Sequence, residues 1–82
     1  PQQIGCAVSE DGFTFRRLFI KEPLMKNGSP GSWNQCESGH PYIYETEKGD
    51  IWLYYQGSAD MGKSWYLSRQ QIAFKDDKPI LI

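Results

Sequence analysis

Residues 40–57 read "HPYIYETEKGDIWLYYQG", and the spacing of their apolar side chains decides the fold class. Two runs rich in β-branched and aromatic residues, 40–45 and 51–57, flank a polar turn at 47–50, which predicts a β-hairpin. In the second run apolar or aromatic residues occupy both alternating sets of positions, whereas a strand with one wet face would alternate with polar residues. We therefore expect sheets or loops to cover this strand on both sides.

Working outward, the same extended pattern recurs along the whole chain. We expect further strands at 4–9, 13–20, 65–74 and 79–82, separated by turn-forming stretches that include Asp11–Gly12 and the run 75–78. A long loop rich in glycine and proline fills most of 21–39. No segment carries an apolar stripe at helical spacing, so the sequence predicts an all-β protein of antiparallel strands.

The composition narrows the function classes. The chain has 82 residues, 39 % of them hydrophobic and 15 % aromatic, with a formal net charge of −1. Binders of nucleic acid or of anionic membranes normally carry a basic excess, which this chain lacks, so we expect neither partner. Its apolar runs are too short to span a bilayer. Residues 1–12 also lack the basic start and apolar core of a signal peptide, and the compartment stays open, with a secreted or periplasmic location favoured.

A weak internal repeat suggests the architecture. "SEDGFTF" at 9–15 and "SADMGKSW" at 58–65 share a serine, an aspartate two residues later, a glycine, a hydroxyl residue and a closing aromatic. Their aspartates, Asp11 and Asp60, are 49 positions apart (60 − 11). A repeat of roughly 40–50 residues built from short strands is typical of β-propeller blades.

These residues carry a resemblance to a known family. "IGCAVSEDGFTFRRL" (4–18) and "GSWNQCESGHPYIYETEKGDIWLYYQGS" (31–58) resemble the strands and turns of five-bladed β-propeller glycoside hydrolases of families 43 and 32, the arabinanase, xylosidase and fructosidase types. "SADMGKSW" also matches a turn motif of sialidase-type propellers, which is structural there and lies away from the active site.

The resemblance implies that the chain is about one and a half blades of such a propeller. Residues 1–22 would be a strand hairpin that ends one blade, 23–40 a loop, and 41–82 one four-stranded blade. The partners would be a carbohydrate substrate and either the remaining blades of a parent chain or other copies of this one. Enzymes of this family combine carboxylates from separate blades, so the segment alone should be inactive.

Glu37 is the expected proton donor. Hydrolysis of a glycosidic bond needs a protonated acid beside the leaving oxygen and a second carboxylate on the other side. The family's donor stands directly before a small residue and a proline, whereas here Ser38–Gly39–His40 separates Glu37 from Pro41. Either Glu37 or His40 could therefore stand at the position of the family's donor. The alternative is that Glu37 is a solvated loop residue without a catalytic role. The second carboxylate is not identifiable in this segment.

Four further residues are expected to bind substrate. His40 could bond a sugar hydroxyl, hold Glu37 in place or replace the acid, or it could simply cap the strand. Trp33 could stack on a sugar ring, although core packing is the commoner fate of an aromatic side chain. Gln56 and Asp60 could contact hydroxyls or only stabilise a turn. The alternative functions are a non-catalytic carbohydrate-binding β-module and a structural propeller blade.

No metal or other cofactor is expected. Two cysteines and one histidine without close spacing do not make a zinc site. Cys6 and Cys36 could pair as a disulfide or remain two buried thiols.

Overall fold

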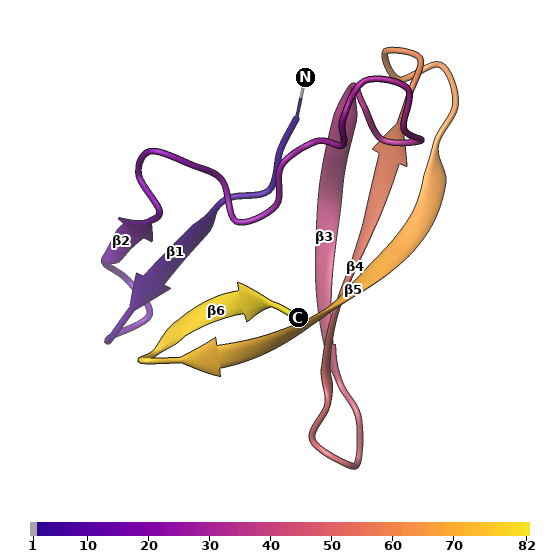
Figure 1. The fold of residues 1–82 in the computed structure, drawn as a ribbon. Coiled ribbons are helices and arrows are strands. Elements are labelled where there is room, and N and C mark those ends of the chain that lie inside the picture. Colours follow the sequence, from indigo (N-terminus) through magenta and orange to yellow (C-terminus); the bar gives the residue numbers. More distant parts are fainter. Residues whose placement is uncertain (1) are drawn as a thin grey trace.

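Six β-strands make up the regular structure of the computed structural model, which describes residues 2–82 (Figure 1). They are listed here in chain order: β1 (Cys6–Ser9), β2 (Phe15–Leu18), β3 (Glu37–Glu45), β4 (Ile51–Ser58), β5 (Tyr66–Lys75) and β6 (Lys78–Leu81). The expected all-β, antiparallel class is confirmed for the described residues, among which no helix forms. It follows that none of these residues belongs to a helix able to cross a membrane.

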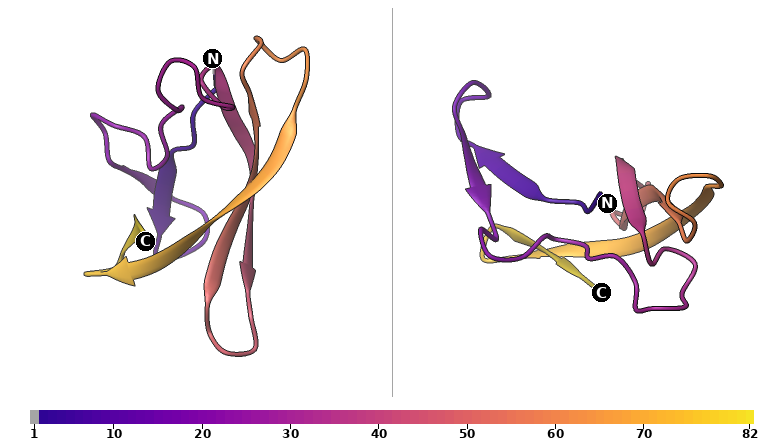
Figure 2. Two further views of the ribbon diagram at one scale, coloured as in Figure 1. Left: turned by 45° about the vertical axis from the view of Figure 1, so that its right-hand side comes forward. Right: turned by 90° about the horizontal axis from the view of Figure 1, so that it is seen from above.

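The strands form two separate antiparallel sheets. β1 and β2 pair as a hairpin, and β3 to β6 form a four-stranded meander in chain order. The four-stranded sheet is strongly twisted, and the β1–β2 hairpin stands beside the end where β5 and β6 pair (Figure 2). The neighbouring-strand order suits the short turns of the sequence, because antiparallel neighbours need only a few connecting residues.

The turns follow the residues that form them. Between β3 and β4 the Gly49 amide donates to the carbonyl of Thr46, and Gly49 adopts a φ of 91°, which favours glycine. Between β5 and β6 only Asp76 and Asp77 intervene, with φ values of 53° and 63°. Positive φ at both central residues is the geometry of the tight two-residue hairpin turn, which aspartate tolerates better than most residues.

The strand register defines the two faces of the four-stranded sheet, because directly opposed residues share a face. We call one the aromatic face; its members between positions 42 and 73 are Tyr42, Tyr44, Trp52, Tyr54, Gln56, Leu67, Arg69, Gln71 and Ala73. We call the other the core face; its members over the same span include Ile43, Glu45, Ile51, Leu53, Tyr55, Ser68, Gln70 and Ile72.

The hydrophobic core lies on the core face. Leu53, Tyr55 and Ile72 of the sheet are buried against Ile4 and Met25, which form an isolated antiparallel bridge. The loop between β2 and β3 therefore contributes directly to the core through Met25. Among residues 2–82 the aromatic face has no comparable cover, since Tyr42 and Tyr44 are exposed there.

The chain exposes more surface than a compact domain of its mass. Its accessible surface is 6203 Å², whereas a compact 9.5 kDa monomer exposes about 5,050 Å². Its radius of gyration is 13.7 Å, against about 11.7 Å for a compact domain of this length. Roughly 1,150 Å² of surface that a compact domain would bury thus stays exposed.

The strand boundaries differ from the expected ones at one functional point. β3 begins at Glu37 rather than His40, so residues 37–40 belong to the strand and not to the loop expected over 23–40. Serine and glycine at 38–39 look like turn formers, but Ser38 and Gly39 pair with Gly57 and Gln56 of β4. Long-range pairing overrides the local preference here.

Candidate functional site

Glu37 lies at the first position of β3, where the N-terminal segment runs along the free edge of the strand. Its Oε2 accepts a hydrogen bond from the backbone N–H of Gln2, at 2.5 Å. The amide of Ser38 in turn donates to the Gln2 carbonyl, at 2.9 Å. Glu37 is half-buried. The Glu37 carboxylate is thus held in a defined position by a residue 35 positions away.

A β-bulge follows directly after Glu37. The register of β3 against β4 shifts between Gly39 and Tyr42, and His40 within the bulge has a φ of 52°. Bulges redirect side chains and are frequent next to active sites. The exposed His40 lines a hollow of 470 Å³ between the bulge and the N-terminal segment; its walls are Gln2, Gln3, Ile4, Gly5, Gly39, His40 and Pro41.

Gln56 shares the face of Glu37. Gln56 stands opposite Gly39, and Glu37 stands opposite Ser58, so Glu37 and Gln56 are diagonal neighbours across β3 and β4. Diagonal neighbours on one face lie about 7–8 Å apart, within reach of long side chains. The structure therefore brings these two expected site residues together.

Trp33 lies at the same end of the sheet but over its other face. Its ring packs against Tyr55, with centroids 5.8 Å apart and planes tilted by 40°, and it occupies the space where a side chain at Gly57 would lie. Gly57 pairs with Ser38, whose neighbour Glu37 points to the opposite face. Trp33 thus packs on the core face, and it also borders a second hollow of 340 Å³ with Tyr66, Leu67 and Ser68.

Asp60 lies in the turn directly after β4. Its Oδ1 accepts hydrogen bonds from the Ser58 hydroxyl and the Ser64 amide, and its Oδ2 accepts from the Ser64 hydroxyl at 2.6 Å. These bonds favour the carboxylate, so the Ser64 hydroxyl first, then the Ser64 amide and Ser58, lower the pKa of Asp60 to about 2. Asp60 organises the β4–β5 turn.

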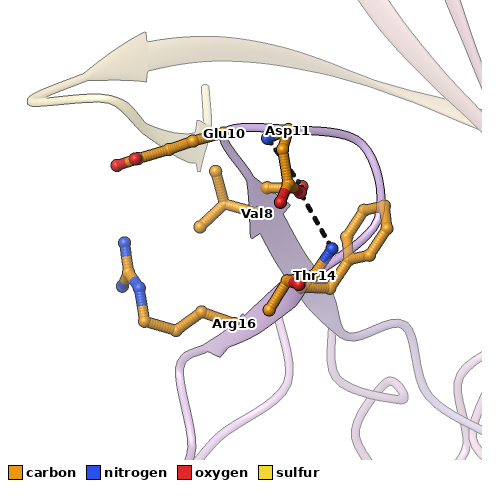
Figure 3. Close-up of a pocket in the computed structure, with 7 residues that line it drawn as sticks. Val8, Glu10, Asp11, Thr14 and Arg16 are labelled. Atoms are coloured by element: carbon orange, nitrogen blue, oxygen red, sulfur yellow. Dashed lines mark hydrogen bonds between the residues drawn. The ribbon is translucent and has the colours of Figure 1, made fainter.

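The matching turn between β1 and β2 has similar bonding, in which the aspartate accepts from the preceding serine hydroxyl and from a later backbone amide. Asp11 Oδ1 accepts hydrogen bonds from the Ser9 hydroxyl and the Phe13 amide. It also accepts one from the Thr14 amide (Figure 3). The Thr14 amide is the largest cause of a lowered pKa at Asp11. The repeat seen in the sequence is thus a repeat of one serine–aspartate turn, and the hollow of 430 Å³ at this hairpin lies at its tip and flank.

Two residues that the sequence did not single out help to build the site. Gln2 binds both Glu37 and Ser38, and a side-chain Cβ at Gly39 would overlap the Gln2 amide. Gln3 accepts a hydrogen bond from the Asn27 amide and so ties the N-terminal segment to the long loop. No local signal marks either glutamine, because both roles depend on partners more than twenty positions away.

The described residues give no sign of a metal centre or a disulfide. No group of three or more histidine, cysteine, aspartate or glutamate side chains within 2–82 is arranged to hold a metal ion. Cys6 and Cys36 are both free thiols, and burial raises the pKa of Cys6.

Comparison with protein-family models, with curated proteins and with solved structures finds no match for this chain.

Proposed function

We propose that the chain is a segment of a carbohydrate-active β-propeller hydrolase and that Glu37 acts on the glycosidic bond as its proton donor. The observation that carries the proposal is the corner at the start of β3. There the half-buried Glu37 carboxylate accepts a hydrogen bond from a backbone N–H. A β-bulge follows it, in which His40 has a left-handed backbone conformation and lines a hollow. Carboxylates so positioned suit acid catalysis of glycoside cleavage.

The chemistry assigns distinct tasks to the neighbouring side chains. A protonated carboxyl keeps one acceptor oxygen, and the Gln2 N–H can hold that oxygen at Oε2. His40 and Gln56 carry donors and acceptors suited to sugar hydroxyls. The base or nucleophile comes from another blade, which makes the isolated segment inactive.

The openness of the chain supports the propeller part of the proposal. A blade within a propeller packs against a neighbour on each face, and this chain leaves roughly 1,150 Å² more surface exposed than a compact domain. The curved four-stranded meander, with an additional hairpin from a second sheet, also suits one and a half blades.

The test compares Glu37→Gln with wild type in the natural reading frame that contains this segment. Substrates are aryl glycosides and arabino-, xylo- and fructo-oligosaccharides, with calorimetry for binding. We expect Glu37→Gln to abolish hydrolysis of natural oligosaccharides and to keep binding. Glu45→Gln is the matched control, because Glu45 lies at the other end of the same strand and should retain full activity.

One observation favours a second candidate, a non-catalytic sugar-binding module. The hollow bordered by Trp33 and Tyr66 offers exposed aromatic surface of the kind that stacks on sugar rings. If wild type binds oligosaccharide without cleaving any, and Trp33→Ala rather than Glu37→Gln removes binding, the module replaces the hydrolase.

A further inference from the structure

The aromatic face carries a cation stacked on an aromatic ring. The Arg69 guanidinium lies 4.0 Å from the centre of the Trp52 ring, in a cation–π contact. Around it, Tyr42, Tyr44 and Leu67 are exposed. Tyrosine, tryptophan and arginine are the residue types that contribute most to protein interfaces. The residue types on this face are therefore those of a protein interface, and no other described segment of the chain packs over Tyr42, Tyr44 and Leu67.

The charges of the two faces are complementary. Over the described strands, the aromatic face carries three cations, Arg69, Lys75 and Lys78, and one carboxylate, Glu37, whereas Glu45 is the one ionised side chain on the core face. Arg69 and Glu45 form no ion pair within residues 2–82. Next to Glu45, Ile43 is also exposed, because Ile4 and Met25 cover only the part of the core face around Leu53 and Ile72.

We propose that copies of this chain associate head to tail, with the aromatic face of one copy on the open end of the core face of the next. Arg69 of one copy then pairs with Glu45 of the other. A two-fold arrangement of aromatic face on aromatic face would instead bring together two faces that each carry three cations and one carboxylate, which is unfavourable. This association uses the faces that neighbouring blades would cover in the proposed propeller, but its test measures oligomeric state and not hydrolysis.

The excess exposed area is sufficient for one such contact per copy. Each partner in a standard protein interface buries about 800 Å². The chain exposes roughly 1,150 Å² beyond what a compact monomer of its mass would. Because the two contacting surfaces differ, the association is heterologous, and it produces a closed ring or an open stack according to the rotation between copies.

The test is sedimentation velocity of the 82-residue chain over a wide range of concentrations, with Arg69→Glu, Glu45→Arg and their equimolar mixture. We expect wild type to exceed the monomer mass as concentration rises. Each single variant brings like charges together, so its apparent Kd should rise at least about tenfold. In the mixture, each variant supplies the charge that the other lacks, so association should return.

Lys48→Glu, in the β3–β4 turn, is the control for a change of net charge and should associate like wild type. Circular dichroism checks that each variant folds, and Arg69→Gln with Glu45→Gln replaces any that does not. The proposal is overturned if wild type stays monomeric throughout, if the single variants associate like wild type, or if the mixture stays dissociated. Saturable binding of an oligosaccharide to the aromatic face of a monomeric wild type would assign the face to a glycan instead.

Discussion

Replacing Gly57 by alanine tests the packing that fixes the loop over the site end of the sheet. A Cβ at position 57 would lie 2.5 Å from Cζ3 of Trp33 and 2.7 Å from Cβ of Asn34, so both residues must move. Overpacking of this kind costs about 1–3 kcal/mol. The displacement of Asn34 would also break its buried hydrogen bond to the Ser38 hydroxyl, which adds about 1 kcal/mol.

We therefore expect Gly57→Ala to lower the free energy of unfolding by about 2–4 kcal/mol, a large share of the stability of a small domain. Urea denaturation followed by circular dichroism measures the loss. In a Trp33→Leu background the same substitution should cost about 1–2 kcal/mol less, because the ring atoms are gone and Asn34 remains. Gly5→Ala is the matched control, since its Cβ would meet only the Arg17 guanidinium at 3.8 Å.

Two results would refute this reasoning. If Gly57→Ala is as stable as wild type, Trp33 does not pack in the space above Gly57. If the loss is the same with and without the indole ring, the clash is not with Trp33.

Two further predictions concern the core and the serine–aspartate turn. Leu53→Ala should lower the free energy of unfolding by about 2–5 kcal/mol in urea denaturation, because Leu53 is only 1 % exposed and its removal leaves a cavity. Asp60 has a folded pKa of about 2 against 3.8 in the unfolded chain, so between these pH values the unfolded state binds more protons than the folded state. The stabilisation from the Asp60 carboxylate is therefore complete well above pH 3.8 and is lost as the pH falls through 2. Asp60→Asn should therefore flatten the acid limb of the stability–pH curve measured by urea denaturation, and an unchanged limb would contradict the assignment.

The sequence was sufficient to predict the strands and the turns because both depend on local patterns. Alternating aromatic and β-branched residues identified β4 and β5, and the recurrence of serine and aspartate two positions apart identified the two equivalent turns. The start of β3 was missed for a physical reason. Ser38 is fully buried, a position that polar residues occupy only with a partner, and its hydroxyl partner is Asn34 in the loop. No local sequence pattern around Asn34 or Ser38 indicates that they form this hydrogen bond.

The position of Glu37 depends on contacts that no local pattern contains. β3 is an edge strand, and an unpaired edge is a liability that proteins cover or block. Here Gln2 covers the upper edge of β3 by accepting the Ser38 N–H, and its own N–H holds the Glu37 carboxylate. The backbone of Gln2 thus both covers the edge of β3 and orients the Glu37 carboxylate. Since Ile4, two residues further on, pairs with Met25 beneath the core face, the same segment links the carboxylate to the hydrophobic core. The geometry of the candidate site is therefore a consequence of tertiary packing, which explains why the placement of Glu37 could not be predicted from sequence.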